Sequence, residues 1–145
     1  MNELKSRAIK LLARREHSRA ELARKLAPLG TREEIDTLLA ELERTKLLSD
    51  VRVADAYLRG HSDRFGIARL RQALRARGIE TGLAEQQLAA GGFPDELARA
   101  RALWTRKFGT PPADRREWAR QARFLQARGF STDVIRHLLR EPEES

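Results

Sequence analysis

The 145-residue sequence contains no cysteine, which excludes disulfide bonds, thiolate catalysis and cysteine-ligated zinc. It also has no apolar run near the roughly 18 residues that a membrane-spanning helix needs. Charged side chains interrupt the first ten positions, MNELKSRAIK, where a secretion signal would require an apolar stretch. These absences favour a cytoplasmic protein without a membrane partner.

Signatures of catalysis are scarce as well. The three histidines, His17, His61 and His137, lack the close spacing of a helical metal-binding pair. The adjacent glycines Gly91-Gly92 are followed by Phe-Pro, which is typical of a turn and not of a phosphate-binding loop. We therefore predict that the protein is not an enzyme and needs no metal or cofactor.

Positive charge, by contrast, is abundant and unevenly distributed. The chain has 29 lysines and arginines against 21 acidic residues, a net charge of +8. Residues 51–79 hold seven arginines and only two aspartates, whereas residues 1–50 hold eleven basic and nine acidic residues. Such a balance favours a polyanionic partner, either nucleic acid, a nucleoprotein complex or an acidic protein surface.

Apolar residues recur every three or four positions along most of the chain, which is the period of an amphipathic α-helix. Two expected helices begin with Ser/Thr-x-x-Glu capping boxes, at Ser18 and Thr31. Asp50 is expected to begin and cap a fourth helix, and Pro94 to lie in the first turn of a seventh. Because no segment shows the alternation of a strand, the predicted fold class is all-α.

Three glycines, Gly30, Gly78 and Gly129, mark an internal repeat. They lie 48 and 51 residues apart, and each follows the middle helix of a group of three. Gly78 is expected to adopt the left-handed conformation that ends a helix. A period of this size predicts three tandem three-helix repeats stacked in an elongated array. The predicted domains are residues 1–49, 50–92 and 93–141, followed by a frayed acidic tail at 142–145.

Four segments resemble the RecX family, the regulatory proteins of the bacterial recombinase RecA. They read ARREHSRAELARKL (13–26), LLSDVRVADAYL (47–58), GIARLRQALRARGI (66–79) and FLQARGFSTDVI (124–135), in the family's order and over nearly the whole chain. The residues that match the family pattern are Ser18, Leu22, Leu26, Asp50, Ala54, Gly66, Arg69, Leu70, Leu74, Gly78, Ile79 and Gly129-Phe130-Ser131.

The resemblance implies both a shape and a role. RecX proteins are elongated, curved arrays of three-helix repeats that bind in the helical groove of the RecA–single-stranded-DNA filament. They damp its ATP hydrolysis, strand exchange and repressor cleavage, and so act in DNA repair, recombination and the SOS response. On this basis we expect a monomer that binds the filament and contacts single-stranded or duplex DNA weakly and without sequence specificity.

Two rows of arginines are the candidate binding residues. Arg71 and Arg75 lie one turn apart on the expected fifth helix, opposite its apolar stripe, and Arg116, Arg120 and Arg123 form a row on the expected eighth. A planar guanidinium can bond two phosphate or carboxylate oxygens at once. The alternative is that these rows are simply solvated faces. The complete set of candidates is Arg64, Arg69, Arg71, Arg75, Arg116, Arg120 and Arg123.

Three aromatic residues could stack on unpaired bases, but their spacing favours core packing. Tyr57, Trp104 and Trp118 each recur with apolar neighbours at helical intervals. We therefore expect these rings to stabilise the fold.

Two other functions remain open. Residues 18–50 resemble the core of a helix-turn-helix DNA-binding regulator, with Thr31 opening the would-be recognition helix. Acidic residues at its start, Glu33 and Glu34, would repel phosphates in the groove. A helical adaptor for an acidic protein is the third possibility.

Overall fold

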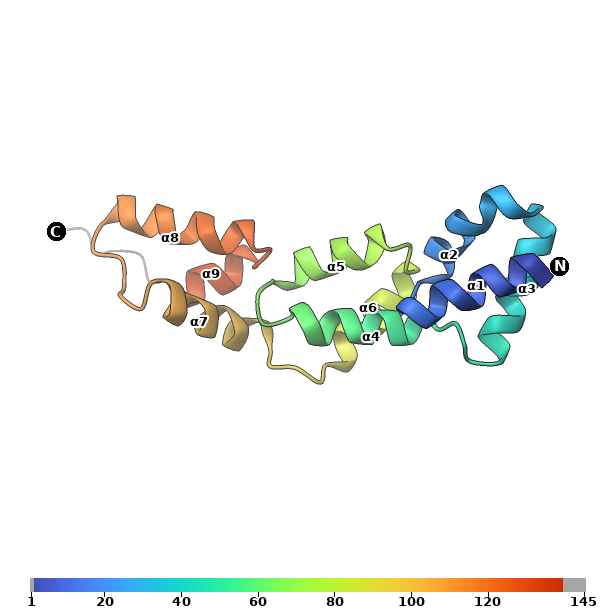
Figure 1. Cartoon of the computed structure of the whole chain (residues 1–145). Coiled ribbons are helices and arrows are strands. Elements are labelled where there is room, and N and C mark those ends of the chain that lie inside the picture. The colour runs from blue at the N-terminus through green and yellow to red at the C-terminus, as the bar shows by residue number, and fades with distance from the viewer. Residues whose placement is uncertain (1, 140–145) are drawn as a thin grey trace. The chain divides into compact units, whose positions relative to one another are not determined.

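The computed structural model describes residues 2–139, and these residues form α-helices and one 3₁₀ turn but no strand (Figure 1). The all-α prediction is confirmed. The predicted tail, residues 142–145, lies outside the described residues. The elements are α1 (Asn2–Arg14), α2 (Arg19–Leu26), η1 (Ala27–Leu29), α3 (Arg32–Arg44), α4 (Asp50–His61), α5 (Ile67–Ala76), α6 (Thr81–Ala90), α7 (Glu96–Lys107), α8 (Arg115–Ala127) and α9 (Thr132–Leu138).

The chain divides into two compact units. Unit 1 comprises the residues up to Tyr57 together with Leu74–Gln87, and unit 2 comprises Leu58–Ala73 and the residues from Leu88 onward. Helices α4, α5 and α6 contribute residues to both units. The predicted repeat boundaries and the elongated, curved array therefore remain predictions.

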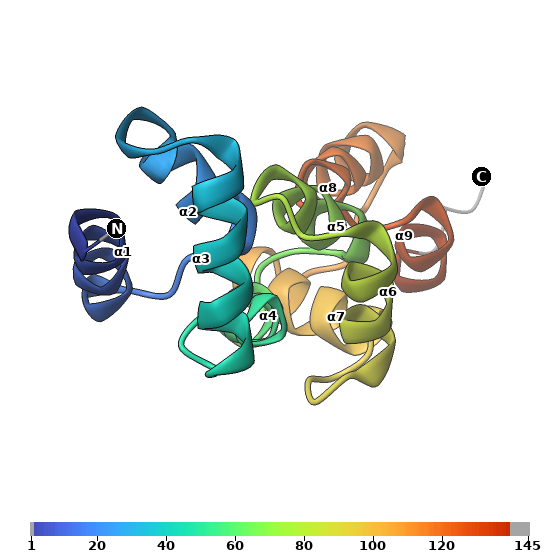
Figure 2. The same ribbon diagram turned by 90° about the vertical axis from the view of Figure 1, so that its right-hand side faces the viewer.

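The core of unit 1 is built by the first three helices. Helix α2 packs against both α1 and α3 (Figures 1 and 2). Burying a leucine contributes about 1.5–3 kcal/mol, so this core is a main source of stability. Its buried residues are Leu4, Ala8, Leu11, Leu22, Leu26, Ile35, Leu38, Leu39, Leu42 and Leu48.

The predicted capping boxes are confirmed. The Ser18 hydroxyl accepts a hydrogen bond from the Glu21 amide, and the Glu21 carboxylate accepts one from the Ser18 amide, both at 3.0 Å. Thr31 and Glu34 are paired in the same way, at 3.1 and 2.9 Å. Each box satisfies two amides at the start of a helix that have no intrahelical acceptor.

Two predictions, the cap of α4 and the position of Pro94 in α7, are wrong. Helix α4 does begin at Asp50, but Ser49 supplies the cap, because its hydroxyl accepts from the Arg52 amide at 3.2 Å. Pro94 lies before α7, not in its first turn, because the Asp95 carboxylate caps the helix through the Ala98 amide at 2.8 Å. In both cases the side chain that caps the helix belongs to the residue next in sequence to Asp50 or Pro94.

In unit 2, α9 packs against α7 and α8 (Figure 1). Trp104 and Trp118 pack against the buried core formed by these helices, so the prediction that they are core residues is confirmed. The indole of Trp104 donates to the side-chain oxygen of Gln121 at 2.8 Å. Gln121 lies where the repeat pattern predicts an apolar residue. It is only 1% exposed, and this hydrogen bond satisfies its buried side-chain oxygen.

Tyr57, the third aromatic candidate, is half-buried in unit 1. The guanidinium of Arg77 lies 4.2 Å from the centre of its ring. The face of the ring thus contacts another side chain of the same unit, as expected for a structural residue.

Gly78 and Gly129, which we call the junction glycines, both have a left-handed backbone, with φ of +78° and +89°. The conformation predicted for Gly78 is confirmed. A Cβ at Gly78 would clash with the Ala20 side chain, and one at Gly129 with the backbone and Cβ of Arg69. Gly30 differs, since its backbone is extended at φ −164°. The junction glycines therefore let the end of one middle helix approach the start of the preceding middle helix.

Hydrogen bonds repeat at the two junctions. The hydroxyl of Ser18, before α2, donates to the Arg77 carbonyl at 2.5 Å. The amide of Gly66, before α5, donates to the Arg128 carbonyl at 2.8 Å. Arg77 and Arg128 each directly precede a junction glycine. A hydrogen bond to the carbonyl before a junction glycine thus occurs once in unit 1 and once in unit 2, as expected for tandem repeats.

An acidic side chain accepts a further hydrogen bond at each of the two junctions. The Asp50 carboxylate, at the start of α4, accepts from the Arg19 amide at 2.7 Å. The Glu96 carboxylate, at the start of α7, accepts from the Ile67 amide at 2.8 Å and from the Ser131 amide at 3.2 Å. Asp50 therefore caps α2 across 31 positions of sequence instead of its own helix.

Candidate polyanion-binding surface

The arginine row on α8 lies on one exposed face. Arg116, Arg120 and Arg123 are all exposed, whereas Gln121 and Leu125 point to the core. Helix α8 is fixed at its start by the Asp114 carboxylate, which accepts from the Glu117 amide at 2.8 Å. The single-face row that we predicted is therefore present, on a helix with a defined start.

The three arginines of this row differ in what they already bind. Arg120 forms two hydrogen bonds with the Glu117 carboxylate, at 2.7 and 2.9 Å, and lies 5.1 Å from the centre of the Phe108 ring. Within residues 2–139, neither Arg116 nor Arg123 makes a hydrogen bond or an ion pair. Arg116 and Arg123 are thus the two members whose donors can turn to an external anion.

Glu117 and Arg120 remain charged over the working pH range. Hydrogen bonding to the Arg120 guanidinium lowers the pKa of Glu117 to about 2, and the same bond raises the pKa of Arg120. Glu117 also accepts a bond from the Gln121 amide at 3.2 Å. The pair contributes no net charge, so the positive field of the row comes from its other two arginines.

The second predicted row, on α5, is only partly exposed. Arg75 is exposed, but Arg71 is half-buried, although it was expected opposite the apolar stripe. The reason is helical geometry, because each residue advances about 100° and Arg71 follows the fully buried Leu70 directly. Arg71 belongs to unit 2 and Arg75 to unit 1.

The two remaining candidates make contacts inside unit 2. Arg69 donates to the Ala127 carbonyl at 3.0 Å, and its guanidinium lies 4.3 Å from the centre of the Phe65 ring. Arg64 lies 3.9 Å from the Asp63 carboxylate and 5.7 Å from the same ring. Arg69 thereby joins the first turn of α5 to the end of α8.

Sequence reasoning missed Arg99, which is only 3% exposed. Its guanidinium donates to the Pro94 carbonyl at 2.9 Å, to the Ser62 carbonyl at 2.9 Å and to the Phe65 carbonyl. Burial lowers its pKa, while the charges of the nearby carboxylates of Glu96 and Asp95 oppose that shift. Arg99 therefore fixes the loop before α5 that carries Arg64 and Phe65.

The C-terminal segment of unit 2 has a strong positive balance. Residues 88–139 contain ten basic and five acidic residues. Guanidinium groups on this surface can bond phosphate or carboxylate oxygens. Among residues 2–139, no group of three or more histidine, aspartate or glutamate side chains could hold a metal ion. None of the described helices is both long enough and apolar enough to cross a membrane.

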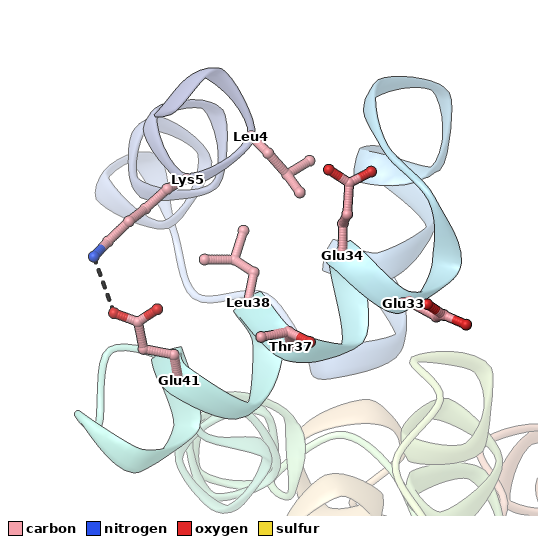
Figure 3. A pocket seen from close by; sticks show the side chains of 7 residues that line it. All are labelled: Leu4, Lys5, Glu33, Glu34, Thr37, Leu38 and Glu41. Carbon is pink, nitrogen blue, oxygen red and sulfur yellow. Dashed lines mark hydrogen bonds and ion pairs between the residues drawn. The ribbon is translucent and has the colours of Figure 1, made fainter. Parts of the chain in front are cut away.

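Helix α3 has the opposite charge. Its 13 residues include five acidic residues and two arginines. It forms one wall of a pocket of about 400 Å³, with α1 as the other wall, where Lys5 and Glu41 are joined at 3.0 Å (Figure 3). The pocket is lined by Leu4, Lys5, Glu33, Glu34, Thr37, Leu38 and Glu41. These carboxylates would repel phosphates, which argues against α3 as a DNA-recognition helix.

Comparisons with known proteins agree in one family. A model of the first three-helix domain of RecX matches residues 5–42, and a model of the third three-helix domain matches residues 94–139. The chain is 51% identical to the regulatory protein RecX of Leptothrix cholodnii over 94% of its own length and 87% of that protein. It is 45% identical to the regulatory protein RecX of Ralstonia nicotianae over 94% and 86%.

Two solved structures share the fold. The crystal structure of RecX from Lactobacillus salivarius superposes with a TM-score of 0.79 at 22% identity, covering 94% of this chain and 92% of that one. A second crystal structure of a regulatory protein RecX gives a TM-score of 0.76 at 24% identity, covering 94% and 71%.

Proposed function

Because the chain belongs to the RecX family of regulatory proteins, we propose that it binds the RecA filament on single-stranded DNA and inhibits the filament's activities. These activities are ATP hydrolysis, strand exchange and repressor cleavage. The protein would act in the cytoplasm as a monomer, during DNA repair, recombination and the SOS response.

One observation carries this proposal. Relatives that cover nearly the whole chain at 40–51% identity, among them those of Leptothrix cholodnii and Herminiimonas arsenicoxydans, all have the name regulatory protein RecX. The exposed arginine row on α8 supports it, because a filament groove offers phosphates and carboxylates to such a row.

The proposed mechanism is steric and electrostatic. Three-helix repeats would lie along the groove and occupy space that incoming DNA needs, or would bridge successive recombinase subunits. Arg116 and Arg123 would contact the polyanion, while Arg120 would stay paired with the Glu117 carboxylate. Altered contacts between subunits would then slow ATP turnover, because the filament hydrolyses ATP as an assembly.

A titration of ATP hydrolysis tests this function. RecA is assembled on single-stranded DNA, and the full chain is added from well below equimolar amounts upward. We expect inhibition below one chain per recombinase subunit, because a bound array affects more than one subunit. Unchanged ATP hydrolysis at every ratio would reject the proposal, and selection of one duplex sequence would support a helix-turn-helix regulator instead.

A further inference from the structure

Large apolar side chains are exposed at four described positions, and two of them line one pocket. Ile9 is 42% exposed and Leu47 is 50% exposed. The pocket of about 380 Å³ lies in unit 1, between the second half of α1 and the segment that joins α3 to α4. Its other lining residues are Leu12, Ala13, Glu16, Lys46 and Arg52. We name it the Ile9–Leu47 pocket.

The segment that carries Leu47 is held by Arg52. Its guanidinium bonds both oxygens of the Glu16 carboxylate, at 2.7 and 3.3 Å. It also donates to the carbonyls of Lys46 and Leu47, at 2.9 and 3.3 Å. One side chain thus fixes the wall of the pocket against the end of α1.

Lys46 has a left-handed backbone, with φ of 66°, and no other described residue except glycine has a positive φ. It closes α3 in a Schellman motif, in which the Lys46 amide donates to Glu43 and the Leu47 amide donates to Leu42. Glycine is the usual residue at this place, because a side chain strains the left-handed backbone. Lys46 therefore occupies a position where glycine would stabilise the fold better.

The rim of the pocket is positive. Glu16 and Arg52 neutralise each other, which leaves Lys46 as the unmatched charge among the lining residues. Within the described residues the Lys46 side chain makes no hydrogen bond or ion pair. The complementary partner is an apolar side chain next to carboxylates.

We propose that the Ile9–Leu47 pocket docks an acidic segment of the recombinase that presents one large apolar side chain. This inference rests on the proposed function, and it separates the contact with protein from the contact with DNA. The pocket contains aliphatic side chains and no aromatic ring on which a base could stack. Polyanion contacts would fall to the α8 row, in unit 2.

The experiment measures two affinities of the full chain separately, for DNA-free RecA and for a single-stranded oligonucleotide. Leu47→Ser and Lys46→Glu should each weaken binding to RecA about tenfold, as for a central interface residue, and leave binding to the oligonucleotide unchanged. Leu29→Ser is the matched control, because Leu29 is 54% exposed and lies outside the pocket. It should bind RecA like the unmodified chain.

Lys46→Gly separates binding from folding. Glycine relieves the left-handed backbone, so this variant should melt at a higher temperature than the unmodified chain. The loss of the ammonium group should nevertheless weaken binding to RecA several-fold. If Lys46 had only a structural role, Lys46→Gly would raise the melting temperature without weakening binding to RecA.

The outcomes are distinct. If the unmodified chain binds RecA and the pocket variants bind it equally well, the pocket assignment is overturned while the proposed function stands. Loss of oligonucleotide binding alone in Leu47→Ser would make the pocket a nucleic-acid site and also overturn the assignment. If the unmodified chain binds neither RecA nor its filament, the proposed function itself is rejected.

Discussion

At the scale of single residues, two buried polar side chains determine much of the local structure, and each leads to a prediction. Arg99 and His17 are 3% and 2% exposed, and both bond to backbone carbonyls. Arginine and histidine are usually found at least partly in solvent, so their burial requires partners.

Arg99→Met should lower the free energy of unfolding by about 2–3 kcal/mol. Methionine fills a similar volume, but it leaves the carbonyls of Pro94, Ser62 and Phe65 without their buried donor. Urea unfolding checks this value. Arg101→Met, an exposed position on the same helix, is the control and should change stability little. Equal effects of the two substitutions would show that the buried guanidinium does not stabilise the loop.

His17 should make stability depend on pH. Burial lowers its pKa below the ordinary value of about 6.5, and its ring nitrogens lie 3.0 Å from the Arg15 carbonyl and 3.1 Å from Lys25 Nζ. The hydrogen bond to the Arg15 carbonyl and the charge of Glu21 oppose this shift, whereas the charges of Arg15 and Lys25 lower the pKa further. The unfolded chain therefore binds the proton more tightly, and folding favours the neutral ring.

The stability contributed by neutral His17 is complete above about pH 6.5 and is lost as the pH falls toward the lower folded-state pKa. Thermal unfolding of the full chain between pH 8 and pH 5 should show this decline, and His17→Gln should flatten it. His137→Gln, at an exposed position, should leave the decline in place. The same slope in His17→Gln would assign the pH dependence to other groups.

At the scale of elements, the junction glycines should tolerate substitution far less than Gly30. Alanine at Gly129 would require a strained left-handed backbone and would place Cβ against the backbone of Arg69. We expect a loss of more than about 2 kcal/mol, measured as a lower urea midpoint. At Gly30 the backbone is extended and the new Cβ would lie 3.3 Å from a Leu4 methyl group. Gly30→Ala should therefore have a small effect, and equal losses would contradict the junction geometry.

Local sequence predicted the elements well because the signals are local. The capping boxes at Ser18 and Thr31 need only a residue three positions away. The role of Asp50 could not be predicted in this way, since its partner is the Arg19 amide of another helix. Arg99 was missed for a related reason. An arginine within a helix is expected to face solvent, and its carbonyl acceptors lie at other places in the chain.

The candidate site was predictable in position but not in detail. Spacing placed Arg116, Arg120 and Arg123 on one face of α8, and all three are exposed. The spacing did not indicate that the Arg120 guanidinium donates hydrogen bonds to the Glu117 carboxylate. Nor did it indicate that Arg69 bonds to the Ala127 carbonyl, 58 positions away. Which charges are already paired depends on side-chain packing, and helical periodicity contains no information about that.

At the scale of the whole molecule, charge of the two signs is separated along the sequence. Helix α3 holds five acidic residues and two arginines, whereas residues 88–139 hold ten basic and five acidic residues. A polyanion will therefore be attracted to the second region and repelled by the first. On a filament bound as we propose, this separation of charge would favour an orientation in which residues 88–139, and not α3, face the phosphates.

The salt dependence of binding to a single-stranded oligonucleotide tests this orientation. If Arg116 and Arg123 contact phosphates, replacing both with glutamine should reduce the slope of log affinity against log salt by about 1.4, or about 0.7 per lost contact. Arg120→Gln should change the slope less, because Glu117 already binds that guanidinium at 2.7 Å. Anisotropy titrations at several salt concentrations measure all three slopes. If the double variant keeps the slope of the unmodified chain, phosphates are bound elsewhere, and the α8 row is a solvated surface.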